Sequence, residues 1–262
     1  VGSVTLGARS DGDGMITYVS SDTAVASVSV TGVVRFYREG TVTITVTAAQ
    51  TSKYERATQT VTITVLPQEK QTLSVTYTYV NAKNKTKTKN YTSEVDFYYA
   101  DKSTTLGVSS TGDGAITFST SDKKIAKVSS AGKVTFTGYG RVVIYVKAAG
   151  TTKYTEATKK IVLHILPQKV TFKSKVTRDS KGKVTIYWNK DKLVTGYKIK
   201  IFADGKKASD AKTYTVTRRK GKLNVGKLKK GTLYHVRIRG YKRSSGKNYY
   251  GDWTYGSFYN AK

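Results

Sequence analysis

The stretch GTVTITV at residues 40–46 recurs one hundred positions later as GRVVIYV at residues 140–146. In the first stretch Val42, Ile44 and Val46 occupy every second position, so an extended chain places them on one face. The second stretch repeats that alternation. This pattern predicts a strand with one buried face, and its recurrence predicts two copies of one β-rich domain.

The match extends in both directions without a gap. Residues 3–68 superimpose on residues 103–168, and roughly half of the paired positions are identical. The only two prolines of the chain fall in LPQ triplets at 66–68 and 166–168. We interpret these triplets as joints and expect three domains, at 1–67, 68–167 and 168–262.

The composition favours an all-β protein. Threonine, valine and tyrosine are abundant in the 262 residues, whereas the chain has 2 prolines, 1 methionine and no cysteine. Without cysteine there is no disulfide and no thiolate metal site. No apolar run approaches the roughly 20 residues of a membrane helix, so we expect no transmembrane segment, and any signal or anchor outside these residues.

The repeated landmarks resemble the bacterial immunoglobulin-like group 2 family, known from surface proteins of Gram-positive bacteria. They are the GDG runs at 12–14 and 112–114, the Ser-Asp pairs at 21–22 and 121–122, and the glycine-led strands at 40–46 and 140–146. The resemblance covers both repeats. It implies tandem immunoglobulin-like β-sandwiches and an extracellular location, at the bacterial surface or secreted, but no particular activity.

A different pattern begins after residue 168. Apolar residues alternate at 184–188, 197–201 and 234–238, and Trp188 ends the first of these runs. The spacing of Leu228 and Tyr234 fits a tyrosine corner, in which the phenol bonds to nearby backbone. Together with Trp253, these residues resemble the fibronectin type III family, which implies a third sandwich with Trp188, Leu228, Tyr234 and Trp253 in structural roles.

The second repeat carries residues 69–102, which the first repeat lacks. Val75, Tyr77 and Tyr79 alternate there, so the segment reads as an opening strand followed by a hairpin or loop. The first repeat therefore lacks its opening strand, which exposes an unpaired edge. We expect that Val1 is a cut point in a longer protein; the alternative is that another chain supplies the strand, which would make self-association or a filament possible.

Positive charge is concentrated in the last module. Of the formal net charge of +29, residues 167–262 carry +21 and residues 69–166 carry +8, whereas residues 1–68 are neutral. Lys198 and Lys200 alternate with buried positions on one predicted strand, as do Arg237 and Arg239 on another. If these strands are neighbours, four permanent charges share one sheet face and should attract polyanions in a salt-dependent manner.

The candidate polyanion site is extended by the nearby turn. Arg243 and Lys247 add positive charge, and Tyr249 and Tyr250 could stack on sugars or bases. Both features have simpler alternatives, since outward lysines keep β proteins soluble and paired tyrosines can belong to the fold. We expect no specific nucleic-acid binding, because the sequence contains no recognised nucleic-acid module.

Residues for catalysis or metal binding are sparse. Of the 2 histidines, His164 stands where the first repeat has Thr64, which favours a surface position, and His235 falls on an outward strand position. Asp11 and Asp13 are interpreted as turn residues that accept backbone hydrogen bonds, because Asp11 is replaced by Thr111 in the second copy. We therefore predict no enzyme activity, no metal and no cofactor, and leave an intramolecular isopeptide bond open.

The sequence thus predicts a non-enzymatic structural or adhesive stalk of a bacterial surface protein. Its basic C-terminal module would contact an anionic cell-wall polymer or a host glycan or protein. The alternatives are a glycan-binding or host-protein-binding module, including an accessory region of a carbohydrate-active enzyme, and a filament subunit completed by a strand from a neighbouring chain.

Overall fold

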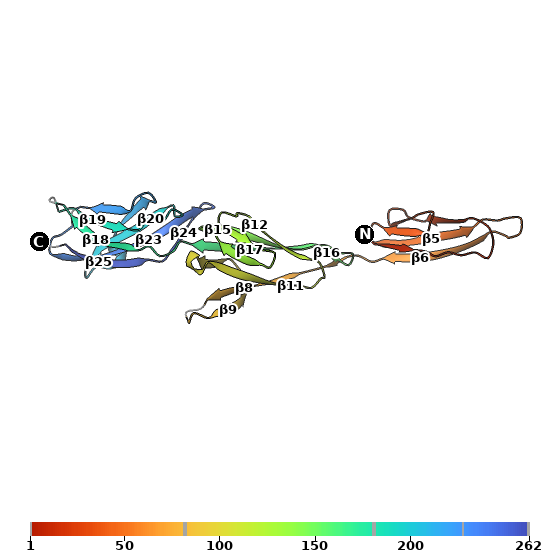
Figure 1. Ribbon diagram of the computed structural model, residues 1–262, viewed down its shortest axis with the longest axis horizontal. Helices are drawn as coiled ribbons and strands as arrows, with labels where there is room; N and C mark the ends of the chain where they lie inside the picture. Colours follow the sequence, from red (N-terminus) through yellow and green to blue (C-terminus); the bar gives the residue numbers. More distant parts are fainter. Residues whose placement is uncertain (1, 81–82, 180–181, 227, 261–262) are drawn as a thin grey trace. The chain divides into compact units, whose positions relative to one another are not determined.

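The computed structural model describes residues 2–80, 83–179, 182–226 and 228–260, as strands, two 3-10 turns and loops (Figure 1). The chain forms two compact units. One contains Val1–Thr72, Ser110–Ala115 and Ala148–Ala157; the other contains Leu73–Ser109, Ile116–Lys147 and Thr158–Lys262. The all-β class predicted from the alternation is confirmed. None of the described helices has the length and apolar character needed to cross a membrane.

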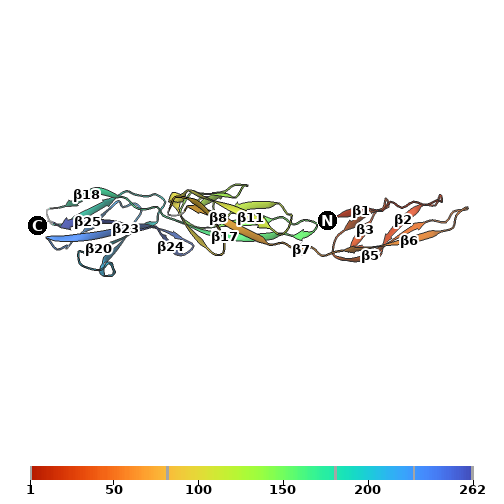
Figure 2. The same ribbon diagram turned by 90° about the horizontal axis from the view of Figure 1, so that it is seen from below.

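The first sandwich consists of two three-stranded sheets. One sheet has the order β1 (Ser3–Thr5), β4 (Val33–Phe36), β3 (Ala26–Val28). The other has the order β2 (Ile16–Ser20), β5 (Gly40–Ala48), β6 (Ala57–Val65). Figure 2 shows β1 and β3 on one side of this sandwich and β5 and β6 on the other. Val42 and Ile44 on β5 are buried in one core with Val25, Ala26 and Val34, as the alternation predicts.

The second sandwich repeats this arrangement and enlarges it. A five-stranded sheet has the order β13 (Ala126–Val128), β14 (Lys133–Phe136), β11 (Ser103–Ser110), β8 (Leu73–Val80), β9 (Thr86–Asn90). A four-stranded sheet has the order β10 (Val95–Tyr98), β17 (Ala157–Leu166), β15 (Gly140–Ala148), β12 (Ile116–Thr120). The short strands β7 (Glu69–Lys70) and β16 (Tyr154–Thr155) pair in parallel, and a 3-10 turn, η1, spans Tyr99–Asp101.

The C-terminal sandwich has a three-stranded and a larger sheet. The smaller sheet has the order β18 (Phe172–Arg178), β19 (Val184–Trp188), β22 (Lys222–Val225). The larger has the order β21 (Lys212–Thr217), β20 (Gly196–Ala203), β23 (Thr232–Ser244), and β23 pairs with both β24 (Lys247–Tyr250) and β25 (Thr254–Asn260). A 3-10 turn, η2, spans Ala208–Asp210. Trp188, Tyr197, Ile199 and Ile238 are among its buried side chains.

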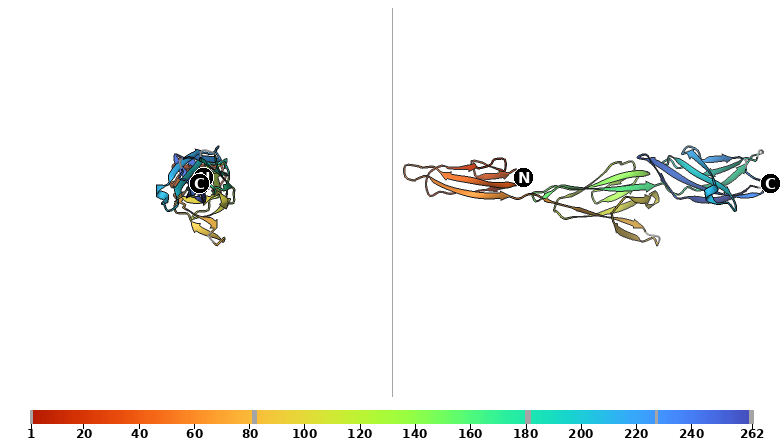
Figure 3. Two further views of the ribbon diagram at one scale, coloured as in Figure 1. Left: turned by 90° about the vertical axis from the view of Figure 1, so that its left-hand side faces the viewer. Right: turned by 180° about the vertical axis from the view of Figure 1, so that it is seen from behind.

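Residues 69–102 form the opening strand and hairpin that their pattern predicts. Strand β8 pairs with β9 in an antiparallel hairpin, and β10 pairs in parallel with β17. Figure 3 shows the β8–β9 hairpin standing out from the rest of the second sandwich. Asn81 and Ala82, which fall in the predicted hairpin or loop, lie outside the described residues, as does Val1. The expected boundaries at 67/68 and 167/168 stay predictions.

The strands that lie near β8 in the second sandwich have shorter or less buried counterparts in the first. Strand β11 runs for 8 residues beside β8, whereas its counterpart β1 runs for only 3. Leu106 is buried, whereas Leu6 at the equivalent repeat position is only partly buried. Ile161 is likewise buried, and its counterpart Val61 is only partly buried. A strand that has lost a partner also loses the hydrogen bonds that hold its backbone extended. Within the described residues, β1 and β6 are therefore unpaired edges.

Two turn motifs behave differently from each other. Asp22 Oδ1 accepts a hydrogen bond from the Ala24 amide at 2.8 Å, and Asp122 repeats this contact with Lys124, so both aspartates are turn residues. In the GDG turn, however, the acceptor is not aspartate. The Gly12 amide donates to Ser10 Oγ at 3.1 Å. Serine takes this role because it stands two residues before the amide, the spacing at which a short side chain reaches it.

Candidate polyanion-binding face

The basic residues of β20 and β23 face the same side of one sheet. The two strands are antiparallel neighbours whose register pairs Lys198 with Arg239 and Lys200 with Arg237. The intervening residues Ile199, Ile201, Val236 and Ile238 are all buried. Because successive side chains on a strand point to opposite faces, the structure places all four cations outward together. We call Lys198, Lys200, Arg237 and Arg239 the cationic face.

Aromatic rings hold the two arginines of this face. The Arg239 guanidinium lies 3.9 Å from the Tyr250 ring centroid and 4.4 Å from that of Trp253. Arg237 lies 4.8 Å from the Tyr255 centroid and 5.4 Å from that of Phe202. Each such contact contributes about 0.5–1 kcal/mol where solvent reaches it. The stacking keeps the guanidinium planes ordered and leaves their charge in place.

Carboxylates do not neutralise this face. Among the described residues, none of the four cations forms an ion pair with Asp or Glu. Burial lowers the pKa of Arg239, and the Nε atoms of Arg237 and Arg239 are buried without a hydrogen-bond partner. Asp204, the nearest acid along β20, instead bonds His235 at 2.8 Å, and this hydrogen bond lowers the pKa of the Asp204 carboxyl. In the described residues, no carboxylate ion pair therefore offsets the charge of the cationic face.

The predicted extension of the site divides between two faces. On the β23–β24 hairpin, Tyr241 pairs with Tyr250 and Arg243 with Asn248, so Arg243 and Tyr250 share the face of Arg239. The alternate positions, Tyr249 and Lys247, point to the opposite face. A tyrosine pair adjacent in sequence cannot form one stacking surface on a strand, because alternation separates the two rings.

Tyr249 and His164 contact each other instead. Their ring centroids are 4.7 Å apart, and the His164 Nδ1 atom lies 2.8 Å from an Asp96 carboxylate oxygen. The His164 side chain is only 12% exposed, which corrects the expected surface position. Among the described residues of the first sandwich, no strand corresponds to β10, which carries Asp96, and Thr64 has no such neighbours there. The outward position expected for His235 is observed.

Hydrogen bonds also join the second and C-terminal sandwiches. The Tyr98 hydroxyl donates to Asp252 at 2.9 Å, and this hydrogen bond raises the pKa of Tyr98. The Tyr139 hydroxyl donates to Asp191 at 2.5 Å. Its burial, together with that bond, raises the pKa of Tyr139. These two carboxylates are thus engaged in hydrogen bonds with tyrosine hydroxyls.

The residues expected to be structural lie in the framework of the C-terminal sandwich. Trp188 is buried edge-on to Tyr197, with ring centroids 5.4 Å apart. The Tyr234 hydroxyl accepts a hydrogen bond from the Lys229 amide at 2.9 Å, which is the tyrosine-corner geometry. The Leu228 carbonyl accepts from Asn260. Trp253 stacks on Arg239 and so also borders the cationic face.

We expect Tyr234→Phe to destabilise the C-terminal sandwich by about 1 kcal/mol, because the Lys229 amide loses its acceptor while the ring stays in place. Residue-resolved hydrogen exchange of the Ile238 amide would measure the change. Tyr255→Phe is the matched control, since Tyr255 is mostly exposed. Equal effects of the two substitutions would contradict a structural role for the phenol of Tyr234.

Sequence reasoning missed two aromatic residues of the face. Phe202 follows Lys198 and Lys200 at the same period of two, so the strand alternation alone could have identified it. Tyr255 has no such signal, because only the pairing of β25 with β23 places it opposite Arg237.

Histidine and acidic side chains are the usual carriers of acid–base and metal chemistry. Both histidines are bonded to carboxylates on ordinary strand positions. The described part of the chain contains no cluster of three or more His, Cys, Asp or Glu residues able to hold a metal ion. A surface of ordered cations and aromatic rings can attract anions and stack on planar or sugar groups.

Comparisons with known proteins give one family match and several similar solved structures. Residues 5–50 match the family model described as "Intimin, immunoglobulin-like domain". No curated protein matches the chain significantly. Similar solved structures include a two-domain fibronectin type III segment of chicken tenascin, with 13% identity over 89% of this chain and 97% of that one, at a TM-score of 0.37.

Two further structures are similar at low TM-scores. The FN1-FN3 domains of chicken CNTN1 share 12% identity over 96% of this chain and 97% of theirs, with a TM-score of 0.33. The fn3 domain of human contactin 1 shares 19% sequence identity over 35% of this chain and 82% of its own length, with a TM-score of 0.27. Immunoglobulin-like and fibronectin-like sandwiches are typically non-catalytic. The intimin-type match indicates that the first sandwich is a module of the kind found in bacterial surface adhesins.

Proposed function

We propose that this chain is a non-enzymatic stalk of a bacterial surface protein whose C-terminal sandwich contacts an anionic polymer through the cationic face. The observation that carries the proposal is the register of β20 and β23, which aligns four cations without a carboxylate ion pair in the described residues. The resemblance of both repeats to the bacterial immunoglobulin-like group 2 family supports an extracellular, cell-surface setting. The ligand class is a phosphate-bearing or sulfated polymer, such as wall teichoic acid or a host glycan.

Salt dependence gives the first test. We assume that each of the four cations neutralises one charge on a flexible polyanion. A plot of the logarithm of the binding constant against the logarithm of the salt concentration then has a slope of about −3. The binding constant itself falls about 50-fold between 50 and 200 mM salt. Titration of the chain into purified teichoic acid, with heparin as the sulfated probe, measures this slope. Binding that is insensitive to salt would contradict the proposal.

A charge-matched pair of variants tests the location. We expect Lys198→Gln with Lys200→Gln to reduce the slope by about 1.4, because two counterion-releasing contacts are removed. Lys229→Gln with Lys230→Gln removes the same charge from exposed positions away from the cationic face and should leave the slope nearly unchanged. If the two double variants weaken binding equally, the attraction reflects net charge and the face is not the site.

One observation favours a glycan-binding alternative. Tyr255 is 63% exposed while its ring lies against Arg237, so one face of an ordered aromatic ring is open to solvent. Sugar rings stack on such platforms with little dependence on salt. Loss of salt-insensitive glycan binding in Tyr255→Ala, with the polyanion slope unchanged, would favour this reading over the first.

A further inference from the structure

A small pocket lies at one end of the cationic face, and we call it the Arg237 pocket. It has a volume of 280 Å³ and is bordered by strands β20, β23 and β25 and by the turn at 204–206. The strand registers pair Phe202 with His235 and Arg237 with Tyr255. Paired residues share one face of a sheet, so these four side chains belong to the outer surface that carries the cationic face.

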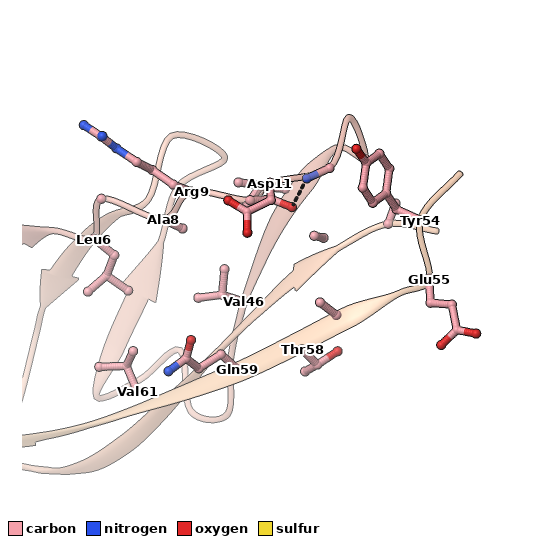
Figure 4. Close-up of a pocket in the computed structure, with 18 residues that line it drawn as sticks. Leu6, Ala8, Arg9, Asp11, Val46, Tyr54, Glu55, Thr58, Gln59 and Val61 are labelled. Atoms are coloured by element: carbon pink, nitrogen blue, oxygen red, sulfur yellow. Dashed lines mark hydrogen bonds between the residues drawn. The ribbon is translucent and has the colours of Figure 1, made fainter. Parts of the chain in front are cut away.

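The larger cavity of the first sandwich offers an anion less attraction. It has a volume of 680 Å³ and borders the carboxylates Asp11 and Glu55. Arg9, the cation among its described lining residues, points away from the other side chains (Figure 4). In the Arg237 pocket, by contrast, two lining residues are cationic and one is acidic. The charge of the Arg237 pocket therefore favours an anionic ligand.

The guanidinium of Arg237 is positioned by aromatic rings but has no anionic partner in the described residues. It lies 4.8 Å from the Tyr255 ring centroid and 5.4 Å from that of Phe202, on the strands either side of β23. Its Nε atom is buried without a hydrogen-bond partner, and no described residue bonds its two Nη atoms. Arginine presents its N–H donors as a planar fork that matches two oxygens of an oxyanion such as phosphate. An anion of the ligand can supply the partner that this guanidinium lacks.

Two other lining residues can bind the uncharged part of a sugar. Tyr255 is 63% exposed although its ring lies against Arg237, so part of the ring surface is open to a ligand. Asp204 Oδ1 lies 2.8 Å from His235 Nε2, and this hydrogen bond lowers the pKa of the Asp204 carboxyl. A carboxylate has about four acceptor positions. Because the Asp204 side chain is 63% exposed, acceptor positions remain for the hydroxyl groups of a ligand.

We propose that the Arg237 pocket binds one sugar residue that carries a phosphate or sulfate group. The anionic group bonds the Arg237 guanidinium, the sugar ring stacks on Tyr255, and a sugar hydroxyl donates to Asp204. The pocket lies just below the roughly 300–1,000 Å³ of small-molecule sites, which limits it to a single sugar unit. The proposal rests on the proposed function for the anionic polymer, and it adds a contact that depends on the structure of the repeating unit.

Titration with monosaccharides tests the pocket without the polymer. The probes are glucose 6-phosphate and glucose 6-sulfate, added to the intact chain at constant ionic strength and followed by amide NMR spectra. We expect saturable shifts of the Gly205 and Gly256 amides, which border the pocket, with dissociation constants of about 1 mM. Glucose and inorganic phosphate should each bind about tenfold more weakly, because each supplies only part of the contacts. The tighter probe identifies a phosphate-bearing or a sulfated polymer as the source of the sugar.

A charge-conserving variant separates the pocket from the net charge. Arg237→Lys keeps the positive charge but loses the planar fork and its stacking, so we expect about tenfold weaker binding of the tighter probe. The salt slope for the polymer should stay unchanged, because the number of cations is the same. Arg243→Lys is the matched control, since Arg243 is exposed and does not border the pocket, and it should bind the probe as the original chain does.

The outcomes distinguish the pocket from the proposed function. Equal binding of glucose or of inorganic phosphate at these amides, no shift at about 20 mM of either anionic sugar, or unchanged affinity in Arg237→Lys would each overturn the pocket. Polymer binding with the expected salt slope would still support the proposed function in those cases. Saturable monosaccharide binding beside salt-insensitive polymer binding would support the pocket and contradict the proposed function.

Discussion

Replacing Trp188 with alanine is expected to lower the free energy of unfolding of the C-terminal sandwich by about 3–5 kcal/mol, the range for removing a large aromatic side chain from a core. Trp188 is 1% exposed and sits on β19, the middle strand of its sheet. Its ring contacts Tyr197 edge-on at 5.4 Å, which joins the two sheets. The cavity left by alanine would lie between the two sheets of the sandwich. Neither sheet can move in to fill it without disturbing the pairing of its own strands.

Residue-resolved hydrogen exchange measures this effect in the intact chain. Exchange at the Ile199 and Ile238 amides should accelerate, whereas Ile44 in the first sandwich should be unaffected, because its core is separate. Trp253→Ala is the matched control: the same ring is removed, but from a partly exposed position stacked on Arg239. Its expected cost is about 1 kcal/mol. Equal costs for both tryptophans would contradict the core assignment of Trp188.

The second large effect concerns the GDG turns, and we expect Gly14→Ala to destabilise the first sandwich by about 3 kcal/mol. A Cβ atom on Gly14 would lie 2.0 Å from the Ala49 carbonyl oxygen. That oxygen belongs to a backbone segment held by the hydrogen bond from the Ala49 amide to the Met15 carbonyl at 3.0 Å. Because the obstacle is backbone, no rotamer change relieves the overlap.

The same clash recurs in the second copy, where a Cβ atom on Gly114 would lie 1.9 Å from the Ala149 carbonyl oxygen. Gly114→Ala should therefore have a comparable cost. Gly7→Ala, in open space, should change stability by less than about 0.5 kcal/mol. Chemical denaturation of the three variants, followed by circular dichroism, separates these outcomes. A Gly14 variant as stable as the Gly7 variant would show that the turn relaxes freely.

The periodicity explains why so much of the fold was predictable. Apolar and polar residues must alternate along a strand with one buried face. The alternation therefore identifies Ile44, Ile144, Ile199 and Ile238 as core residues without any tertiary information. The hundred-residue repeat adds the relation between the first two sandwiches. It also predicts that the strand at 73–80 has no counterpart among the given residues of the first repeat, and the sheet orders of the described residues agree.

Contacts between distant strands were beyond this reasoning. The alternation predicts which face of the sheet Arg237 occupies, but not which aromatic ring lies against it. Only the pairing of β25 with β23 brings Tyr255 beside Arg237. Likewise, His164 looked like a surface residue because Thr64 replaces it, yet β10 and Tyr249 cover it. Such neighbours depend on sheet order, which a single sequence does not specify.

The sequence by itself therefore determined the all-β class, the repeated domain, the core residues and the basic character of the last module, because these depend on local alternation and on charge count. Only the tertiary structure decided which cations are ordered by aromatic rings, which candidates turn to the opposite face, and that a pocket lies beside Arg237. The physical reason is that stacking, burial and pockets arise between strands, and the register that pairs them is set by the packing of whole sheets.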